Sequence, residues 1–146
     1  MLFRSRKLVT LEALSYDKIV TLISGEKMIA YYVSSQTHPV QLRVIGPTKL
    51  RISTRLNYDS TMKGEQKYSV SVWEAEKKLK LKPLSTTKSV GVHYKEMSNY
   101  IPGKVNAFFI DIPNGEHIYK FNVGETNSKS VSMKFSIPQK DLKNEE

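Results

Sequence analysis

The most regular pattern in the chain is an alternation of apolar and polar residues between positions 40 and 56, broken once by Gly46-Pro47. A period of two is typical of a β-strand that buries one face. The apolar positions are Val40, Leu42, Val44, Leu50 and Ile52. Because a Gly-Pro pair cannot continue a regular strand, the pattern predicts two strands joined by a turn at Gly46-Pro47-Thr48.

The register of this predicted hairpin follows from its apolar face. With 46–48 as the loop, Val44 lies opposite Leu50 and Leu42 lies opposite Ile52. Both are apolar pairs on one side, as a hairpin with one buried face requires. A slip of one residue would move every side chain to the other face, so the alternation favours this register over its neighbours.

The polar face of the same hairpin is rich in arginine. The predicted register places Arg43 directly opposite Arg51, with Arg55 further along the row, and like charges in such pairs repel. Two interpretations remain open. The face is either solvated, with acidic residues from a neighbouring segment relieving the repulsion, or it binds an anion or an acidic partner. The candidate residues of such a site are Arg43, Lys49, Arg51 and Arg55, because guanidinium groups suit bidentate contacts with anions.

Similar alternation recurs along most of the remaining chain. The further predicted strands are 16–23, 28–33, 66–74, 78–82, 88–94, 105–112, 117–123 and 130–137, while 7–14 fits a strand or a helical turn. Turn signals separate them, and the strongest is Pro113-Asn114-Gly115-Glu116. This pattern predicts a single domain over residues 1–146, an all-β antiparallel β-sandwich of immunoglobulin-like or jelly-roll-like type, with a closed barrel as the alternative. The charged tail 139–146 is expected to fray.

The alternation also predicts which side chains form the core. The expected core residues are Val40, Leu42, Val44, Leu50, Ile52, Val70, Val72, Phe108, Ile110, Val131, Met133 and Phe135. Residues 78–82 alternate lysine with leucine, and a lysine face of this kind opposes aggregation at a sheet edge. We therefore expect this segment at an edge, followed by a loop at 83–87.

Composition restricts the classes of function. The chain has 146 residues, a net charge of +9 from 23 Lys and Arg against 14 Asp and Glu, and no cysteine. Without cysteine there is no disulfide, no thiolate nucleophile and no cysteine-based zinc site. The lysines are spread along the chain, which favours solubility and weak attraction to polyanions, so no specific nucleic-acid partner is expected. No apolar run approaches the roughly 20 residues of a membrane helix, and residues 1–7 lack the apolar stretch of a signal peptide.

Residues with catalytic or metal-binding chemistry are scattered. His38, His93 and His117 lie far apart with no carboxylate at ligand spacing, so the sequence predicts no metal site and no cofactor. It contains no nucleophile elbow, no phosphate-binding loop, no dinucleotide-binding fingerprint and no zinc-protease motif. We therefore expect a protein that is not an enzyme.

Trp73 is the single tryptophan, and alternation places it on the same side of its predicted strand as Ser69 and Ser71. If that side faces solvent, Trp73 together with Tyr94 or Tyr100 would form an aromatic platform on which sugar rings stack. The alternative is that a loop or a second layer covers the indole, since large aromatic side chains are mostly buried.

Three short motifs combine turns with strands: IGPTKLRISTR at 45–55, IPGK at 101–104 and IPNGEH at 112–117. In these motifs the chain resembles uncharacterised bacterial exported β-sandwich proteins. The resemblance implies a periplasmic or extracellular domain of the cell envelope that is not an enzyme. It carries over no catalytic residue, because the motifs describe backbone turns and strands.

Three functions fit these observations. The first is a structural or protein-interaction module of the bacterial cell envelope, with another protein as its partner. The second is a carbohydrate-binding module, and the third is a binder of polyanions such as nucleic acid or an anionic polysaccharide. An unpaired apolar edge would favour the first, a row of exposed aromatic residues the second, and a contiguous face of arginine and lysine the third.

Overall fold

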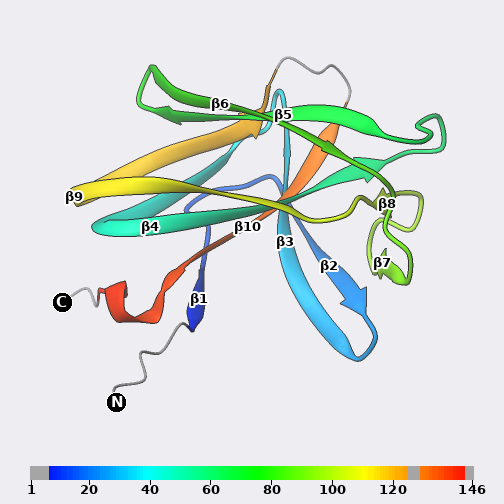
Figure 1. The fold of residues 1–146 in the computed structure, drawn as a ribbon, viewed down its shortest axis with the longest axis horizontal. Coiled ribbons are helices and arrows are strands. Elements are labelled where there is room, and N and C mark those ends of the chain that lie inside the picture. The colour runs from blue at the N-terminus through cyan, green and yellow to red at the C-terminus, as the bar shows by residue number, and fades with distance from the viewer. Residues whose placement is uncertain (1–6, 125–128, 144–146) are drawn as a thin grey trace.

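The computed structural model is organised around its two longest strands, β4 (Val40–Tyr58) and β9 (Asn106–Val123). They pair antiparallel along almost their whole length, with a bulge where the register shifts between Gly46 and Thr48. Both strands bend at this point and run back (Figure 1). Each strand therefore contributes one half to each of two layers.

The structure describes residues 7–124 and 129–143, so the predictions for residues 1–6 and for the end of the tail at 144–146 lie outside the described residues. The remaining elements are β1 (Leu8–Leu11), β2 (Lys18–Ser24), β3 (Lys27–Ser35), β5 (Gln66–Glu74), β6 (Lys77–Thr86), β7 (Val92–Tyr94), β8 (Ile101–Pro102), β10 (Ser130–Pro138) and the 3₁₀ turn η1 (Gln139–Asp141). All the strand pairings among these elements are antiparallel.

The strand order β6-β5-β9-β4-β10-β3-β2-β7 divides into two layers at the bent β4–β9 pair. The first layer holds β6, β5, the second half of β9 and the first half of β4. The second layer holds the other halves of β9 and β4, followed by β10, β3, β2 and β7, with β1 pairing along β10. The prediction of an all-β antiparallel sandwich is confirmed, and β6 lies at an edge as its lysines predicted.

The predicted hairpin at 40–56 is wrong in its strand pairing. The chain does reverse at Gly46-Pro47, whose peptide bond is cis, but the two arms lie in different layers and do not pair with each other. Val44 pairs with His117 and Leu50 pairs with Ile110, both in β9. The predicted turn at 113–116 is likewise a bend inside β9, and it faces the bend of β4. The two segments with turn-forming residues, 46–48 and 113–116, pair with each other and form one shared corner instead of two separate hairpins.

Other strands begin or end at residues that differ from the predicted ones, because pairing with a neighbouring strand lengthens or shortens them. Predicted strand 66–74 matches β5 in full, whereas 88–94 retains only the three residues of β7. The loop expected at 83–87 instead continues β6 through Thr86. The tail does not fray at its start, because η1 forms there and Thr48 Oγ1 donates a hydrogen bond to Asp141 Oδ2 at 2.8 Å.

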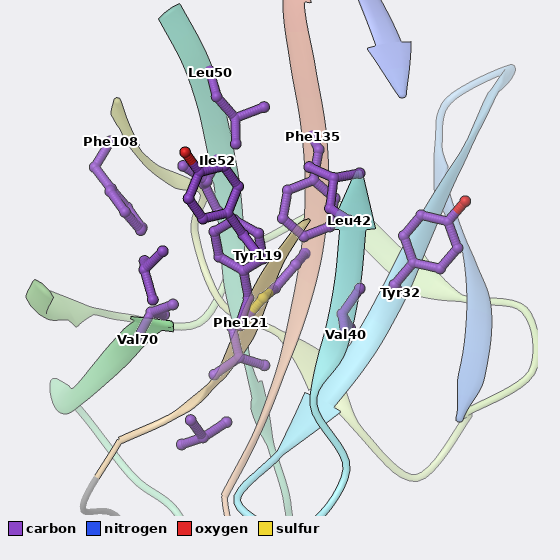
Figure 2. Packing of buried hydrophobic residues seen from close by; sticks show 14 of the residues in the cluster. Tyr32, Val40, Leu42, Leu50, Ile52, Val70, Phe108, Tyr119, Phe121 and Phe135 are labelled. Carbon is purple, nitrogen blue, oxygen red and sulfur yellow. The ribbon is translucent and has the colours of Figure 1, made fainter. Parts of the chain in front are cut away.

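The main core lies between the two layers, and Figure 2 shows its aromatic and aliphatic side chains in contact. All the predicted core residues are buried except Ile110, which is partly buried and packs against the cluster. Phe121 of the first layer and Phe135 of the second have ring centroids 4.8 Å apart. A second, smaller cluster joins β2 and β3 to the segment that contains β7; its buried members are Val20, Leu22, Tyr31, Tyr94 and Met97.

Candidate functional site

The arginine row predicted from the hairpin does not exist, because the two arms of β4 lie in different layers. Arg43 lies in the first layer, where its Nη2 and Nε contact Oε2 of Glu116 at 2.6 and 2.7 Å. Arg51 lies on the second layer between Phe109 and Ser136 of the flanking strands. Arg43 and Arg51 are therefore separated by the bend, and the repulsion expected between them is absent.

Arg55 has a structural role. Its Nη1 donates to the Gly103 carbonyl oxygen at 2.9 Å and to Ser89 Oγ at 3.2 Å, and its Nε donates to the Tyr31 hydroxyl at 3.2 Å. These three partners belong to segments that are far apart in the sequence. The guanidinium group therefore holds the loops around β7 and β8 against the second layer.

Lys49 and Arg51 share the outer face of the second layer with an exposed aromatic ring. Lys49 Nζ lies 5.7 Å from the ring centroid of Phe109, whose side chain is 49% exposed. Among the residues that the structure describes, Nε of Arg51 is the buried side-chain polar atom without a hydrogen-bond partner. Anion binding by this pair stays a prediction.

Trp73 is partly buried in β5, on the outer face of the first layer. Its Nε1 donates to Ser71 Oγ at 3.1 Å, which agrees with the predicted side of the strand. Two ammonium groups lie over the same ring: Nζ of Lys78 is 5.5 Å from the ring centroid and Nζ of Lys120 is 5.6 Å from it. The ring of Trp73 therefore has an ammonium group of a lysine on either side and does not present an unobstructed apolar surface.

The predicted platform of Trp73 with Tyr94 or Tyr100 is not assembled. Tyr94 is 2% exposed, and its hydroxyl lies 2.5 Å from Asn57 Oδ1 and 2.9 Å from Ser132 Oγ. Burial raises the pKa of this hydroxyl above its ordinary value. Tyr100 packs beside Tyr94 in the smaller cluster, on the other layer from Trp73, so neither tyrosine can share a ligand with the indole.

Two shallow depressions meet at Gln41 and form what we name the Gln41 groove. The first has a volume of about 410 Å³ and is lined by Gln41, Glu74, Ala75, Glu116, Ile118, Tyr119 and Lys120. The second has a volume of about 320 Å³ and is lined by Ser15, Tyr16, Asp17, Thr37, His38, Pro39 and Gln41. Gln41 lines both, so the two depressions adjoin at this residue.

Strand register explains why these side chains gather. Ser15 forms a bridge with Gln41, Gln41 pairs with Lys120, and Lys120 pairs with Trp73. Residues paired across antiparallel strands project to the same face, so the four form one row across the outer surface of the first layer. Three strand spacings of about 4.8 Å give this row a length of roughly 14 Å.

Two glutamates line the groove, and each is oriented by a cationic partner, but their carboxylates lie on opposite faces of the layer. Glu116 is on the outer face, whereas Glu74 pairs with the buried Tyr119 and reaches His117 on the inner face. Glu116 is held by Arg43, and Oε2 of Glu74 accepts a hydrogen bond from Nδ1 of His117 at 2.7 Å. The hydrogen bond with Glu74 raises the pKa of His117 above its ordinary value. In the described part of the chain, Oε1 of Glu116 makes no hydrogen bond, so this oxygen is available to a ligand in the groove.

Sequence reasoning found only part of this site. The sequence indicates Arg43 as part of an arginine row and Trp73 as part of an aromatic platform, which are two different sites. Glu74 and Glu116 were missed because they lie next to turn signals, where acidic residues are ordinary. Lys120 gave no signal, since one lysine in a basic chain carries little information.

Within residues 7–124 and 129–143, no group of three acidic, histidine or cysteine side chains is placed to hold a metal ion. Over the same residues, no helix has the length and apolar character needed to cross a membrane.

No family model matches the sequence, and no curated protein matches it. The fold is similar to that of a solved structure named the Agl-KA catalytic domain, with a TM-score of 0.56 and 14% identity over 92% of this chain. The chain spans 28% of that domain's length, and at this identity the likeness concerns the fold alone.

Two weaker similarities cover most of both chains. The C-terminal CBM6 of LamC from Zobellia galactanivorans has 15% identity over 91% of this chain and 100% of its own, with a TM-score of 0.45. A carbohydrate-binding module, CBM36, in complex with calcium and xylotriose has 11% identity over 89% of this chain and 97% of its own, with a TM-score of 0.42. TM-scores below 0.5 are too low to support an argument about site or ligand.

Proposed function

We propose that this domain binds a carbohydrate chain in the Gln41 groove without cleaving it. The observation that supports the proposal is the pre-oriented carboxylate of Glu116, which lies in an open groove whose floor includes the half-exposed side chain of Ile118. Sugars present hydroxyl groups together with apolar C–H faces. A few fixed polar groups around an apolar surface are the usual means of recognising such a ligand.

Pre-orientation matters because it lowers the entropy lost on binding. The ion pair with Arg43 holds the Glu116 carboxylate in place before the ligand arrives. Gln41, whose Oε1 accepts a hydrogen bond from Ser15 Oγ at 3.2 Å, adds an amide group that can donate to the ligand. The groove follows the row from Ser15 through Gln41 to Lys120, which suits an extended chain that passes across the sheet.

The edge of the sandwich gives less support to an interaction module that works by strand addition. β6 is the edge strand of the first layer, and it carries Lys77, Lys78, Lys80 and Lys82. Lysines on an edge strand oppose pairing with another chain. A role in the cell envelope and a periplasmic or extracellular location, as the resemblance implies, stay predictions.

Affinity electrophoresis against a panel of soluble polysaccharides would test the proposal. We expect at least one polysaccharide to retard the domain, and Gln41→Ala to weaken that binding about tenfold or more because Gln41 belongs to both depressions. The matched control is Arg51→Gln on the other layer, which should bind as the parent does. Binding that Gln41→Ala leaves unchanged would remove the groove as the site, and no retardation by any polysaccharide would contradict the function.

A further inference from the structure

Beside the Gln41 groove, next to its lining residue Lys120, lies positive charge that no acidic side chain of the described residues balances. Lys78 of β6 and Lys120 of β9 both pair with Trp73, which lies between them in the sheet. Each ammonium group lies within 5.6 Å of the indole centroid, so the two charges are within about twice that distance of each other. Along residues 7–124 and 129–143, neither lysine forms a hydrogen bond or an ion pair with an acidic group.

The acidic residues of the groove do not supply the missing counter-charge. Glu116 is engaged by Arg43 and Glu74 by His117. The indole attracts each ammonium through its ring quadrupole but carries no net charge, so it positions the lysines without neutralising them. Two fixed cations with no counter-ion form an electrostatic site for an anionic group.

We propose that the ligand of the Gln41 groove is an acidic glycan, and that Lys78 and Lys120 select it by attracting the carboxylate of a uronic acid residue. This inference rests on the proposed carbohydrate function and adds the chemical class of the ligand. Lysine ammonium groups held against a ring have already lost part of their rotamer freedom. Contact with a carboxylate therefore costs less entropy than contact with unrestrained surface lysines would.

The same groove disfavours nucleic acid. A nucleic acid carries a phosphate at every nucleotide, and its binding depends on neutralising many of these charges. Glu116 would face such a backbone within the groove and repel it. A glycan in which acidic sugars alternate with neutral ones can place its carboxylate at the lysines and its hydroxyl groups at Glu116 and Gln41.

The test compares uronate oligosaccharides with their methyl-esterified forms, which keep the sugar chain and lose the charge. We expect the parent domain to bind an acidic oligosaccharide about tenfold more tightly than its ester by isothermal titration calorimetry at low salt, and expect added salt to reduce this preference. The double variant Lys78→Gln/Lys120→Gln should bind both forms with equal affinity, close to that of the parent for the ester.

The control is Lys80→Gln/Lys82→Gln, which removes the same total charge, both from β6, at lysines without a cation–π contact to Trp73. It should keep the preference for the acidic form, and thermal unfolding should show that both double variants are folded. Equal binding of acid and ester by the parent, equal loss in the control, or equally tight binding of single-stranded DNA would overturn the inference while leaving carbohydrate binding intact. Failure of every acidic and neutral glycan to bind would overturn the proposed function, and the inference with it.

Discussion

Gly46 lies directly against the carbonyl of Pro113, so that a Cβ added at Gly46 would be 1.9 Å from that oxygen and 2.7 Å from the carbonyl oxygen of Ile112. This contact joins the bends of β4 and β9 at the corner where the strand pair passes from one layer to the other. Any side chain larger than hydrogen would push the two backbones apart. The corner therefore requires glycine for space.

Gly46→Ala should lower the free energy of unfolding by about 3 kcal/mol or more, because the atoms in the way belong to the backbone and cannot turn aside. Chemical denaturation would measure the loss. The control is Gly25→Ala, where φ is +61° but nothing lies within 4 Å, and the cost should be about 1 kcal/mol. Equal losses at the two positions would show that the backbones do not approach so closely.

Leu42→Ala should cost about 2–5 kcal/mol, since Leu42 is fully buried between the layers and leaves a cavity when truncated. Ile110→Ala should cost clearly less, because Ile110 is only partly buried. Urea unfolding of both variants measures the two losses in the free energy of unfolding. A loss below about 1 kcal/mol at Leu42 would contradict the placement of the first layer over the core.

Arg43→Gln should lower stability slightly, by less than about 1 kcal/mol, through loss of the partly exposed pair with Glu116. This reverses the expectation from the predicted hairpin, in which removing Arg43 would have relieved repulsion. Because such pairs are screened, the loss should shrink as salt is added. Thermal unfolding at low and high salt measures it, and Arg51→Gln, with no ion pair in the described residues, should show no such salt dependence.

The His117–Glu74 pair predicts a pH dependence of stability. The pKa of His117 is raised in the folded state, so protonation favours folding. The contribution is fully present below the unfolded-state pKa of about 6.5 and is lost as pH rises through the higher folded-state pKa. Melting temperatures of the parent and of His117→Gln, measured from about pH 5 to about pH 9, should therefore converge as pH rises. A difference that grows with pH would contradict the pairing.

Tyr94→Phe should lower stability by about 1 kcal/mol, because it removes a buried hydroxyl that lies between Asn57 and Ser132. Ser132 and Asn57 still contact each other at 3.1 Å, which limits the cost. Tyr100→Phe is the control and should be near neutral. Since Tyr94 is buried away from the Gln41 groove, glycan binding by Tyr94→Phe should equal that of the parent, and a loss of binding would return Tyr94 to the site.

The sequence alone was enough to predict the all-β class, the edge position of β6, the full extent of β5 and the burial of all but one of the core residues it named, although it named no member of the smaller cluster. These properties depend on the alternation of side chains along a single strand, and that alternation is visible in the local pattern. Leu42 and Ile52 are buried whichever strand lies beside them. Burial could therefore be predicted even though the pairing partners were wrong.

Only the tertiary structure decided which strands pair and which side chains meet. A Gly-Pro signal marks a change of direction, and it looks the same in a tight hairpin and in a corner shared by two strands. The choice between them depends on β9, about seventy residues further along the chain. Gln41, Lys120 and Trp73 come together because three distant segments pair side by side, and this long-range pairing leaves no trace in the sequence around any one of them.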